Sequence, residues 1–373
     1  MSTNNGMMYA PVYEAKPVVK PGEFVFAAMA LDHGHIYGMC NGLLEAGGTL
    51  KWVYDPDPIK VQEFMARYTG VQAAQSAEEI LEDADVRLVA AAAVPCERGP
   101  LGIQVMNAGK DYFTDKTPFT ELEQLEAAKQ VVQRTGRKYM VYYSERLHVE
   151  SAVYAGRLIQ EGAIGRVIQV MGTGPHRLSA SGRPAWFFEK SKYGGILCDI
   201  GSHQIEQFLY YAGCKDASVV RSQVGNYANA SYPELEDFGD AMLVGDNGAT
   251  NYFRVDWFTP NGLSVWGDGR CTILGTEGYI ELRKYVDIAR SEKGNHVYWV
   301  DQKGEHYVDV GGKVGYPFFG ELILDCLHRT EHAMTQQHVF KAAELCLQAQ
   351  AQAVSLVSAG GQVLNVDHHE VRR

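Results

Sequence analysis

Two ionisable residues, Asp199 and His203, lie four residues apart at the end of the stretch Tyr193–His203. On a helix, that spacing places both side chains on one face. A histidine titrates near neutral pH and is the usual base for removing a hydroxyl proton, while a nearby carboxylate can position a substrate or tune the histidine. The preceding Gly194 and Gly195 permit close approach of the backbone. The alternative interpretation is a helix start with a capping aspartate and a buried histidine.

A lysine, Lys116, follows a predicted strand in the segment Asp115–Pro118. In a doubly wound sheet, ligands bind at the carboxyl ends of the strands. A lysine there can donate a hydrogen bond to a substrate hydroxyl and stabilise negative charge on its oxygen during hydride loss. The alternative is a surface lysine in a turn.

The first strand–helix turn, Ala30–Gly38, is where a dinucleotide pyrophosphate would lie on a helix N-terminus. The usual fingerprint is Gly-x-Gly-x-x-Gly, but this turn has only Gly34 and Gly38, and neither holds the first two glycine places. The carboxylate of Asp32 would disfavour a pyrophosphate unless it points away or caps the helix. By itself, the turn only weakly favours a nucleotide site.

Two histidines in the same turn, His33 and His35, form a His-x-His pair that can indicate a metal site. Apart from Asp32, no Cys, Asp or Glu at a suitable spacing completes a ligand set. We therefore expect no metal. We expect these side chains to line the cofactor turn or to cap the helix.

An acid, Asp55, ends the second predicted strand. At this place in a Rossmann sheet, a carboxylate accepts hydrogen bonds from the ribose hydroxyls of the adenosine. A carboxylate would also repel a 2′-phosphate, which favours NAD over NADP. The alternative, weighed equally, is that Asp55–Pro58 is only a turn and a helix cap.

The elements that would position these residues alternate strand and helix through the first half of the chain. The predicted strands are 24–30, 50–54, 87–94, 112–114 and 138–143. The predicted helices are 35–46, 58–68, one opened by a Ser76/Glu79 capping box, one ending near Gly109, and one running from a Thr120/Glu123 capping box to Thr135. Because parallel strands need crossover helices, the fold class is α/β, with a doubly wound parallel sheet. The pattern matches the Rossmann type, whose sheet has six strands, one more than the five ranges named above.

The second half changes character after a predicted helix at 148–161 and a strand at 166–172. From residue 218 to about 310 the pattern is strand, glycine-rich turn, strand, which predicts a largely antiparallel sheet. Residues 318 to about 358 are predicted to be helical. The expected organisation is an N-terminal arm at 1–20, a dinucleotide-binding domain at 21–145 and a C-terminal α/β domain at 146–373.

Composition excludes several functional classes. The net charge is −11, so the chain has no basic field to attract nucleic acid or an anionic membrane. No apolar run is long enough to span a bilayer, and the first 20 residues do not have the pattern of a signal peptide. The seven scattered cysteines include no Cys-x-x-Cys pair, which argues against a disulfide framework or a zinc site. A cytoplasmic location is expected.

Several segments together resemble one family, the Gfo/Idh/MocA oxidoreductases. Residues Gly194–His203 resemble its Gly-Gly-x-x-x-Asp-x-Gly-x-His motif, which is the most specific match, and Asp115–Lys116 resembles its Glu-Lys-Pro motif. Val94–Pro95 and Ala108–Lys110 resemble the segments before that motif. Gly162–Arg166 resembles the turn before the first strand of the second domain.

The resemblance runs from about residue 24 to the C-terminal helices and implies a Rossmann domain followed by a domain with an open, mostly antiparallel sheet. It implies Lys116, Asp199 and His203 as the catalytic residues, with the histidine as acid/base and the lysine orienting the hydroxyl and lowering the histidine pKa. Val94, Pro95 and Lys116 would contact the cofactor, in addition to the turn residues and Asp55. The large sheet often forms the interface of homodimers or homotetramers in this family.

The implied activity is NAD-dependent oxidation of a hydroxyl on a sugar, cyclitol or sugar acid. The segment after the last parallel strand supplies Arg146, and a loop that could cover the cleft supplies His176, Arg183 and Trp186. We expect Arg146, His176 and Trp186 to bind substrate, although each could equally be a surface residue. Arginine favours a carboxylate on the substrate.

This sequence departs from the family pattern in three places. The glycine fingerprint is eroded, Thr117 separates Lys116 from Pro118 while Asp115 replaces the usual Glu, and the polar residue and His expected near 96–100 are not in register. Two alternatives therefore stay open. One is a redox-neutral, NAD-dependent enzyme that cleaves a glycoside, and the other is a non-catalytic, ligand-sensing protein on the same fold.

Overall fold

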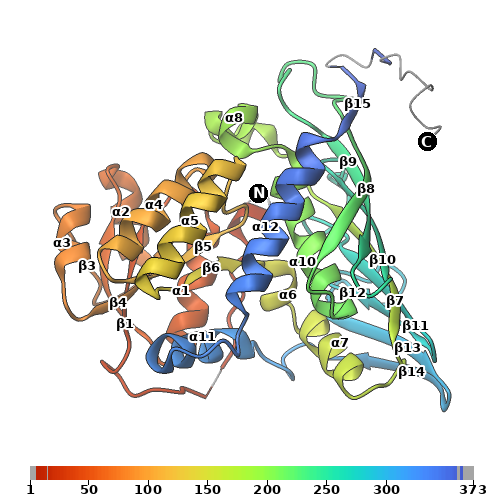
Figure 1. Ribbon diagram of the computed structural model, residues 1–373, viewed down its shortest axis with the longest axis horizontal. Helices are drawn as coiled ribbons and strands as arrows, with labels where there is room; N and C mark the ends of the chain where they lie inside the picture. The colour runs from red at the N-terminus through yellow and green to blue at the C-terminus, as the bar shows by residue number, and fades with distance from the viewer. Residues whose placement is uncertain (1–5, 15, 359–361, 364–373) are drawn as a thin grey trace.

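The computed structural model describes residues 6–14, 16–358 and 362–363, which fold around two β-sheets (Figure 1). The first sheet has six parallel strands in the order β3-β2-β1-β4-β5-β6, which confirms the predicted Rossmann sheet. Its strands are β1 (Val25–Met29), β2 (Thr49–Tyr54), β3 (Gln72–Ala73), β4 (Val86–Ala91), β5 (Asp111–Asp115) and β6 (Tyr139–Tyr142).

Burial explains which of these strands the sequence predicts well. The central strands β1, β4, β5 and β6 are almost wholly buried, as expected for short apolar runs covered on both faces. Strand β3 is different, because Gln72 and Ala73 are both exposed at the sheet edge beside β2. A two-residue, exposed edge strand leaves no apolar pattern, and no strand was predicted there.

Five helices accompany the parallel sheet: α1 (His35–Glu45), α2 (Pro58–Arg67), α3 (Ala77–Glu82), α4 (Pro95–Asn107) and α5 (Leu122–Thr135). Ser76 caps α3 by accepting a hydrogen bond from the Glu79 amide, as predicted. The capping box predicted at Thr120 is wrong. The N-cap of α5 is Glu121, and the Thr120 amide instead donates to the side chain of Gln124.

The second sheet has nine strands in the order β14-β13-β12-β11-β7-β10-β9-β8-β15. All its neighbours are antiparallel except β7–β10 and β8–β15, which confirms a mostly antiparallel sheet. Its strands are β7 (Val167–Pro175), β8 (Ala217–Gly225), β9 (Phe238–Gly245), β10 (Thr250–Asp256), β11 (Arg270–Gly275), β12 (Tyr279–Arg283), β13 (His296–Asp301), β14 (Gly304–Asp309) and β15 (Val354–Val357).

Helices cover the side of this sheet that faces the Rossmann domain (Figure 1). The remaining elements are the 3-10 turns η1 (Gly6–Met8), η2 (Ala180–Gly182) and η3 (Ala185–Phe188), and the helices α6 (Ser144–Leu147), α7 (Glu150–Gln160), α8 (Lys190–Tyr193), α9 (Ile196–Asp199), α10 (Gly201–Ala212), α11 (Pro317–His328) and α12 (Gln336–Ala351). No helix in the described ranges combines the length and the apolar character needed to cross a membrane.

The C-terminal segment corrects one prediction and ties the two halves together. The helical pattern predicted up to residue 358 ends at Ala351, and β15 follows, pairing with β8. Helix α12 packs against α5, while α11 packs against α1, where the ring of Phe319 fills the space beside Gly42. Residues late in the chain therefore cover the first domain.

The described part of the N-terminal arm packs on its own chain. The hydroxyl of Tyr9 donates to the carbonyl of His148 at 2.8 Å, and the amide of Tyr13 donates to Glu45 at 2.9 Å. The ring of Tyr9 lies edge-on to Trp266 and Tyr285. The arm thus bridges the two domains and reaches the cleft between them.

Candidate active site

Six of the residues predicted from the sequence line one narrow cavity at the carboxyl ends of the parallel strands. They are His33, His35, Lys116, His176, Asp199 and His203. They come from the first strand–helix turn, from the end of β5, from the segment after β7 and from α9 and α10. Residues far apart in the sequence therefore meet at the edge of the sheet where an α/β fold binds ligands.

The amine of Lys116 forms a hydrogen-bonded ion pair with Oδ1 of Asp199. Lys116 is buried, as expected for a residue inside a cleft and unlike the surface lysine of the alternative interpretation. Burial opposes ionisation of Asp199, but the charge and hydrogen bond of Lys116 outweigh it and hold the pKa of Asp199 below its usual value. The pair therefore presents a positioned ammonium and an anionic carboxylate to the cavity.

His203 lies in the first turn of α10 and is buried. Its Nδ1 has no hydrogen-bond partner among the residues that the structure describes. Burial lowers the pKa of His203 to about 3; the charge of Glu145 opposes this shift and that of Lys116 adds to it. At neutral pH the imidazole is therefore uncharged and able to accept a proton.

The two glycines before this segment have a specific structural role. Gly194 and Gly195 have φ of +86° and +90°, conformations that other residues rarely adopt. A Cβ on Gly195 would lie 2.2 Å from the side chain of Gln350 in α12. Gln350 in turn accepts a hydrogen bond from the Leu197 amide, which fixes the start of α9. Asp199 ends the four-residue helix α9 and His203 lies in the first turn of α10, which begins at Gly201, so the predicted helical spacing is divided between two consecutive helices.

One residue of the cofactor turn adopts a backbone conformation that favours glycine, and two carboxylates of the turn have partners. Ala30 has a positive φ of 52°, at the place where the fingerprint has its first glycine. The carboxylate of Asp32 pairs with Lys60 at 2.6 Å, so its charge is compensated. Asp55 accepts hydrogen bonds from the amides of Leu31 at 2.6 Å and Asp57 at 2.9 Å. Asp55 therefore also braces the turn.

The two histidines of the turn gather around Asp115. Nδ1 of His33 lies 3.1 Å from Asp115 Oδ2, and Nδ1 of His35 lies 2.9 Å from Oδ1. These three residues place possible metal ligands within 4.8 Å of one another. However, the guanidinium of Arg98 already lies 3.2 Å from the same carboxylate. Nε2 of His35 lies 3.0 Å from the carbonyl oxygen of Gly6, so both ring nitrogens of His35 already have oxygen partners. The contacts are those of an ion-pair network.

The turn residues fit a dinucleotide, but the arm lies across them. Gly34, the N-cap of α1, has no side chain to occupy the helix N-terminus, but the His35 amide already donates to Nδ1 of His33 at 3.3 Å. The carbonyl oxygen of Met7 lies only 2.5 Å from where a Cβ on Gly34 would be. Val94 and Pro95 begin α4 at the end of the neighbouring strand β4. A pyrophosphate on α1 would therefore require the arm to move aside.

Two predicted substrate residues do not reach this cavity. Arg146 turns away and pairs with the buried Glu206, its Nε lying 2.7 Å and 2.9 Å from the two carboxylate oxygens. Its guanidinium also stacks on Tyr210, and it lines a different cavity. Trp186 lies in η3, where its neighbour Phe187 is the residue that lines the catalytic cavity.

Two further charged residues line the cavity: Glu145, which the sequence analysis did not place there, and Arg183, which it placed in the loop over the cleft. Glu145 is buried and immediately precedes Arg146. Arg183 donates to the carbonyls of Leu178 and Arg177 and forms no salt bridge within the described ranges. Two charged residues, Glu145 and Arg146, follow the buried strand β6 in α6, and the sequence does not show which of them enters the cavity.

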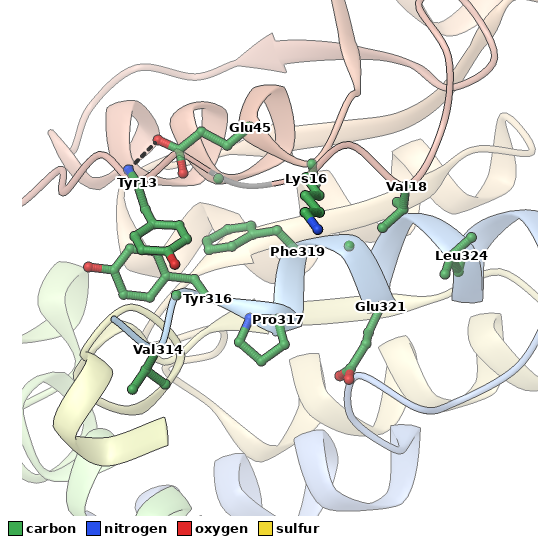
Figure 2. A pocket seen from close by; sticks show the side chains of 14 residues that line it. Tyr13, Lys16, Val18, Glu45, Val314, Tyr316, Pro317, Phe319, Glu321 and Leu324 are labelled. Atoms are coloured by element: carbon green, nitrogen blue, oxygen red, sulfur yellow. Dashed lines mark hydrogen bonds between the residues drawn. The ribbon is translucent and has the colours of Figure 1, made fainter. Parts of the chain in front are cut away.

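A larger cavity, of about 310 Å³, lies where the arm crosses α1 and α11 (Figure 2). Figure 2 shows Tyr13 and Tyr316 side by side at one end, with the Tyr13 amide bound to Glu45. Phe319 and Pro317 form much of its wall. None of the predicted catalytic residues lines it, so the narrower cavity is the candidate active site.

The fold and the position of this cleft are those of a two-domain, dinucleotide-binding oxidoreductase. The chain belongs to the Gfo/Idh/MocA family. Residues 29–143 match the model of an oxidoreductase family with an NAD-binding Rossmann fold, and residues 153–281 match the GFO/IDH/MocA C-terminal domain.

Known proteins support this assignment. The chain is 29% identical over 231 residues to scyllo-inositol 2-dehydrogenase (NAD(+)) of Bacillus subtilis (strain 168), an alignment that spans 60% of this chain and 64% of the relative. A crystal structure from Erwinia carotovora atroseptica SCRI1043, described as that of a candidate oxidoreductase, is 54% identical. It superposes with a TM-score of 0.87 over 90% of this chain and 100% of that one. Levoglucosan dehydrogenase in complex with NADH shares the fold at 18% identity and a TM-score of 0.71, over 88% of this chain and 97% of the other.

Proposed function

We propose that the chain is an NAD-dependent dehydrogenase that oxidises a hydroxyl of a sugar, a cyclitol or a sugar acid. The observation that carries the proposal is the meeting of the Lys116–Asp199 ion pair and the unpartnered Nδ1 of His203 in one cavity. Relatives named for scyllo-inositol, levoglucosan and D-xylose support the substrate class.

In the proposed reaction, each of the three side chains has a distinct task. Lys116 donates a hydrogen bond to the hydroxyl oxygen and stabilises the negative charge that develops there. Asp199 holds the ammonium in place and remains ionised. His203, uncharged at neutral pH, accepts the hydroxyl proton on a ring nitrogen. Bound NAD supplies the nicotinamide carbon that receives the hydride.

The charge of Arg183 supports a sugar acid within this substrate class. Burial lowers the pKa of Arg183 to about 10. The side chain contacts backbone carbonyls and the rings of Phe187 and Trp257, and it forms no salt bridge in the described ranges, although the charge of Asp199 acts on it from a distance. A cation in a cleft that forms no direct salt bridge with a side chain favours a ligand that carries a carboxylate.

The test is to measure NADH formation by absorbance with scyllo-inositol, levoglucosan, D-xylose and the corresponding sugar acids. Net NADH formation with any of them supports the proposal. Release of an aglycone from a chromogenic glycoside without net NADH would instead show the redox-neutral reaction. The arm across the cofactor turn favours the sensing alternative, which predicts sugar binding with neither reaction.

Asp55→Ala is expected to weaken NAD binding and to relax discrimination against NADP. The proposed reason is that the carboxylate at the end of β2 both accepts ribose hydrogen bonds and repels a 2′-phosphate. Calorimetric titration of each variant with NAD and NADP measures the ratio of the two dissociation constants. Asp57→Ala is the matched control, because Asp57 caps α2 in the same turn. An unchanged ratio in Asp55→Ala would rule out this role.

The open face of the nine-stranded sheet is proposed to form the interface of a homodimer or homotetramer. Met242, Tyr252 and Met171 are partly exposed and lie side by side in register on β9, β10 and β7. Substituting Met171→Lys and Tyr252→Lys together should lower the mass measured by light scattering, because the interface would bury two unpaired charges. Ile59→Lys, on the exposed surface of α2, should leave the mass unchanged. A double variant that keeps the wild-type mass would place the interface elsewhere.

A further inference from the structure

A buried carboxylate, Glu145, lines the catalytic cavity and has only one of its two oxygens occupied. Oε2 accepts hydrogen bonds from Nζ of Lys284 at 2.9 Å and from Nε2 of Gln204 at 3.1 Å. Oε1 is buried and has no hydrogen-bond partner among the described residues. Buried polar atoms nearly always have a partner, so an oxygen left free inside a cleft points to a ligand.

A second buried charge keeps Glu145 in its anionic form. Lys284 is fully buried and donates to Gln207 at 2.7 Å as well as to Glu145. Burial opposes ionisation of Glu145, but the charge and hydrogen bond of Lys284 outweigh it and lower the pKa of Glu145 to about 2. The amides of Gln204 and Gln207 flank His203 on α10, and Gln207 also donates to the His203 carbonyl at 2.7 Å. The carboxylate is therefore fixed beside the proposed base.

His176 presents a second acceptor to the same space. Its Nδ1 lies 3.1 Å from the carbonyl oxygen of Gly174, so Nδ1 carries the proton and donates it. Burial lowers the pKa of His176 to about 4, so the ring is neutral at neutral pH and Nε2 is an acceptor. Nε2 lies 4.0 Å from Oε1 of Glu145, too far for a direct hydrogen bond. Two acceptors thus face each other across a gap.

We propose that Glu145 and His176 form a diol subsite that holds two adjacent hydroxyls of the substrate. One hydroxyl donates to Oε1 of Glu145 and its neighbour donates to Nε2 of His176. Two acceptors require two donors, which a single hydroxyl does not supply and a vicinal diol does. This inference rests on the proposed function, because it assigns specificity to the same polyol-oxidising cleft.

The rings around His176 fix the direction of the subsite. The imidazole lies 4.4 Å from the ring of Trp266 and 5.4 Å from that of Trp257, measured between centroids. These contacts restrict rotation of the imidazole ring, so Nε2 stays directed toward Glu145. The subsite therefore selects the position and configuration of a diol relative to the hydroxyl that His203 deprotonates.

The test variant is Glu145→Gln. Its carbonyl oxygen would be retained by Lys284 and Gln204, which places the amide NH₂ where the free oxygen was. A donor then faces His176 and replaces one substrate hydroxyl. The matched control is Glu206→Gln, since Glu206 is also a buried carboxylate paired with a cation but does not line the cavity. A double variant, Glu145→Gln with Lys284→Met, removes both charges of the buried pair. It therefore leaves no unpaired buried lysine that could destabilise the fold.

The measurement is calorimetric binding of scyllo-inositol, levoglucosan, D-xylose and their monodeoxy analogues in the presence of NADH, which prevents oxidation during the titration. In the wild type, removing either hydroxyl of one adjacent pair should weaken binding at least ~10-fold, as for loss of a hydrogen bond to a charged group. Glu145→Gln and the double variant should lose a similar factor for the parent polyol and no longer distinguish it from the analogue lacking the hydroxyl that donates to Glu145. Glu206→Gln should behave as the wild type.

Retained affinity and retained preference in both Glu145 variants would overturn the diol subsite, and so would a wild type that binds none of the three polyols. The outcome is separable from the proposed function because binding with NADH needs no turnover. Wild-type binding that follows the predicted pattern, without NADH formation from NAD, would reject the dehydrogenase and keep the subsite. If the wild type forms NADH and the Glu145 variants keep their affinity and preference, the dehydrogenase would be kept and the diol subsite rejected.

Discussion

His203→Ala is expected to lower turnover at least ~100-fold, as for loss of a general base, while leaving NAD binding nearly intact. The side chain lies at the start of α10, on the wall of the cavity that also holds Lys116 and Asp199. Burial keeps the imidazole uncharged at neutral pH, in the form that accepts a proton. The rate of NADH formation measures the loss, and calorimetric titration with NAD checks that the cofactor site is preserved.

A matched control for this variant is His338→Ala. His338 also lies near a buried carboxylate, with its Nε2 3.0 Å from Glu206, but it belongs to α12 and does not line the cavity. Its substitution should leave turnover within about threefold of the wild type, as expected for a residue outside the reacting geometry. Full activity in His203→Ala would remove this histidine from the proposed mechanism.

The sequence predicts the fold well where burial leaves a regular pattern. The strands β1, β4 and β6 are apolar runs with both faces covered, and their alternation with helices determines the parallel order. Strand β15 is not predicted because it has only four residues, follows a long helix after a two-residue gap and has one buried residue. Its strand conformation comes from pairing with β8, a contact between distant segments that no local pattern encodes.

The sequence predicts those residues of the candidate site that lie directly after a strand or in a segment that requires glycine. Lys116 follows β5, and the Gly194–Gly195 pair requires positive φ, so both positions carry signals in the sequence itself. The choice between Glu145 and Arg146 carries no such signal. Both follow β6 in the short helix α6, and which of them enters the cleft depends on partners more than fifty residues away. Sequence reasoning selected the arginine, whereas the structure directs the glutamate into the cavity.

The course of the N-terminal arm is a second feature beyond the reach of local pattern. Its proline-containing composition shows only that it is neither a strand nor a helix of the core. The contact of Gly6 with His35 across the cleft depends on the tertiary placement of both segments. The arm also lies against the turn that lacks the glycines of the fingerprint, because the carbonyl of Met7 packs on Gly34.

The Arg146–Glu206 pair leads to the second large expected effect, which concerns stability. Glu206 is fully buried and accepts hydrogen bonds from Arg146 and from His338. Arg146→Met is expected to lower the free energy of unfolding by about 3–5 kcal/mol, because it leaves a buried carboxylate without its main cation. KM for substrate should change little, since Arg146 lines another cavity. Urea unfolding and steady-state kinetics measure the two quantities.

The pH dependence of this loss distinguishes an ion pair from simple packing. Burial opposes ionisation of Glu206, but Arg146 and His338 outweigh it and lower its pKa to about 2 in the folded protein, below the unfolded value of about 4.3. A lowered pKa means that the pair contributes its full stability above the unfolded value and loses it as the pH falls toward 2. The deficit of Arg146→Met should therefore be largest at neutral pH and shrink in acid. The double variant with Glu206→Leu should recover most of it, because both charges are then gone. A stable Arg146→Met protein with a raised KM would instead return Arg146 to the substrate site.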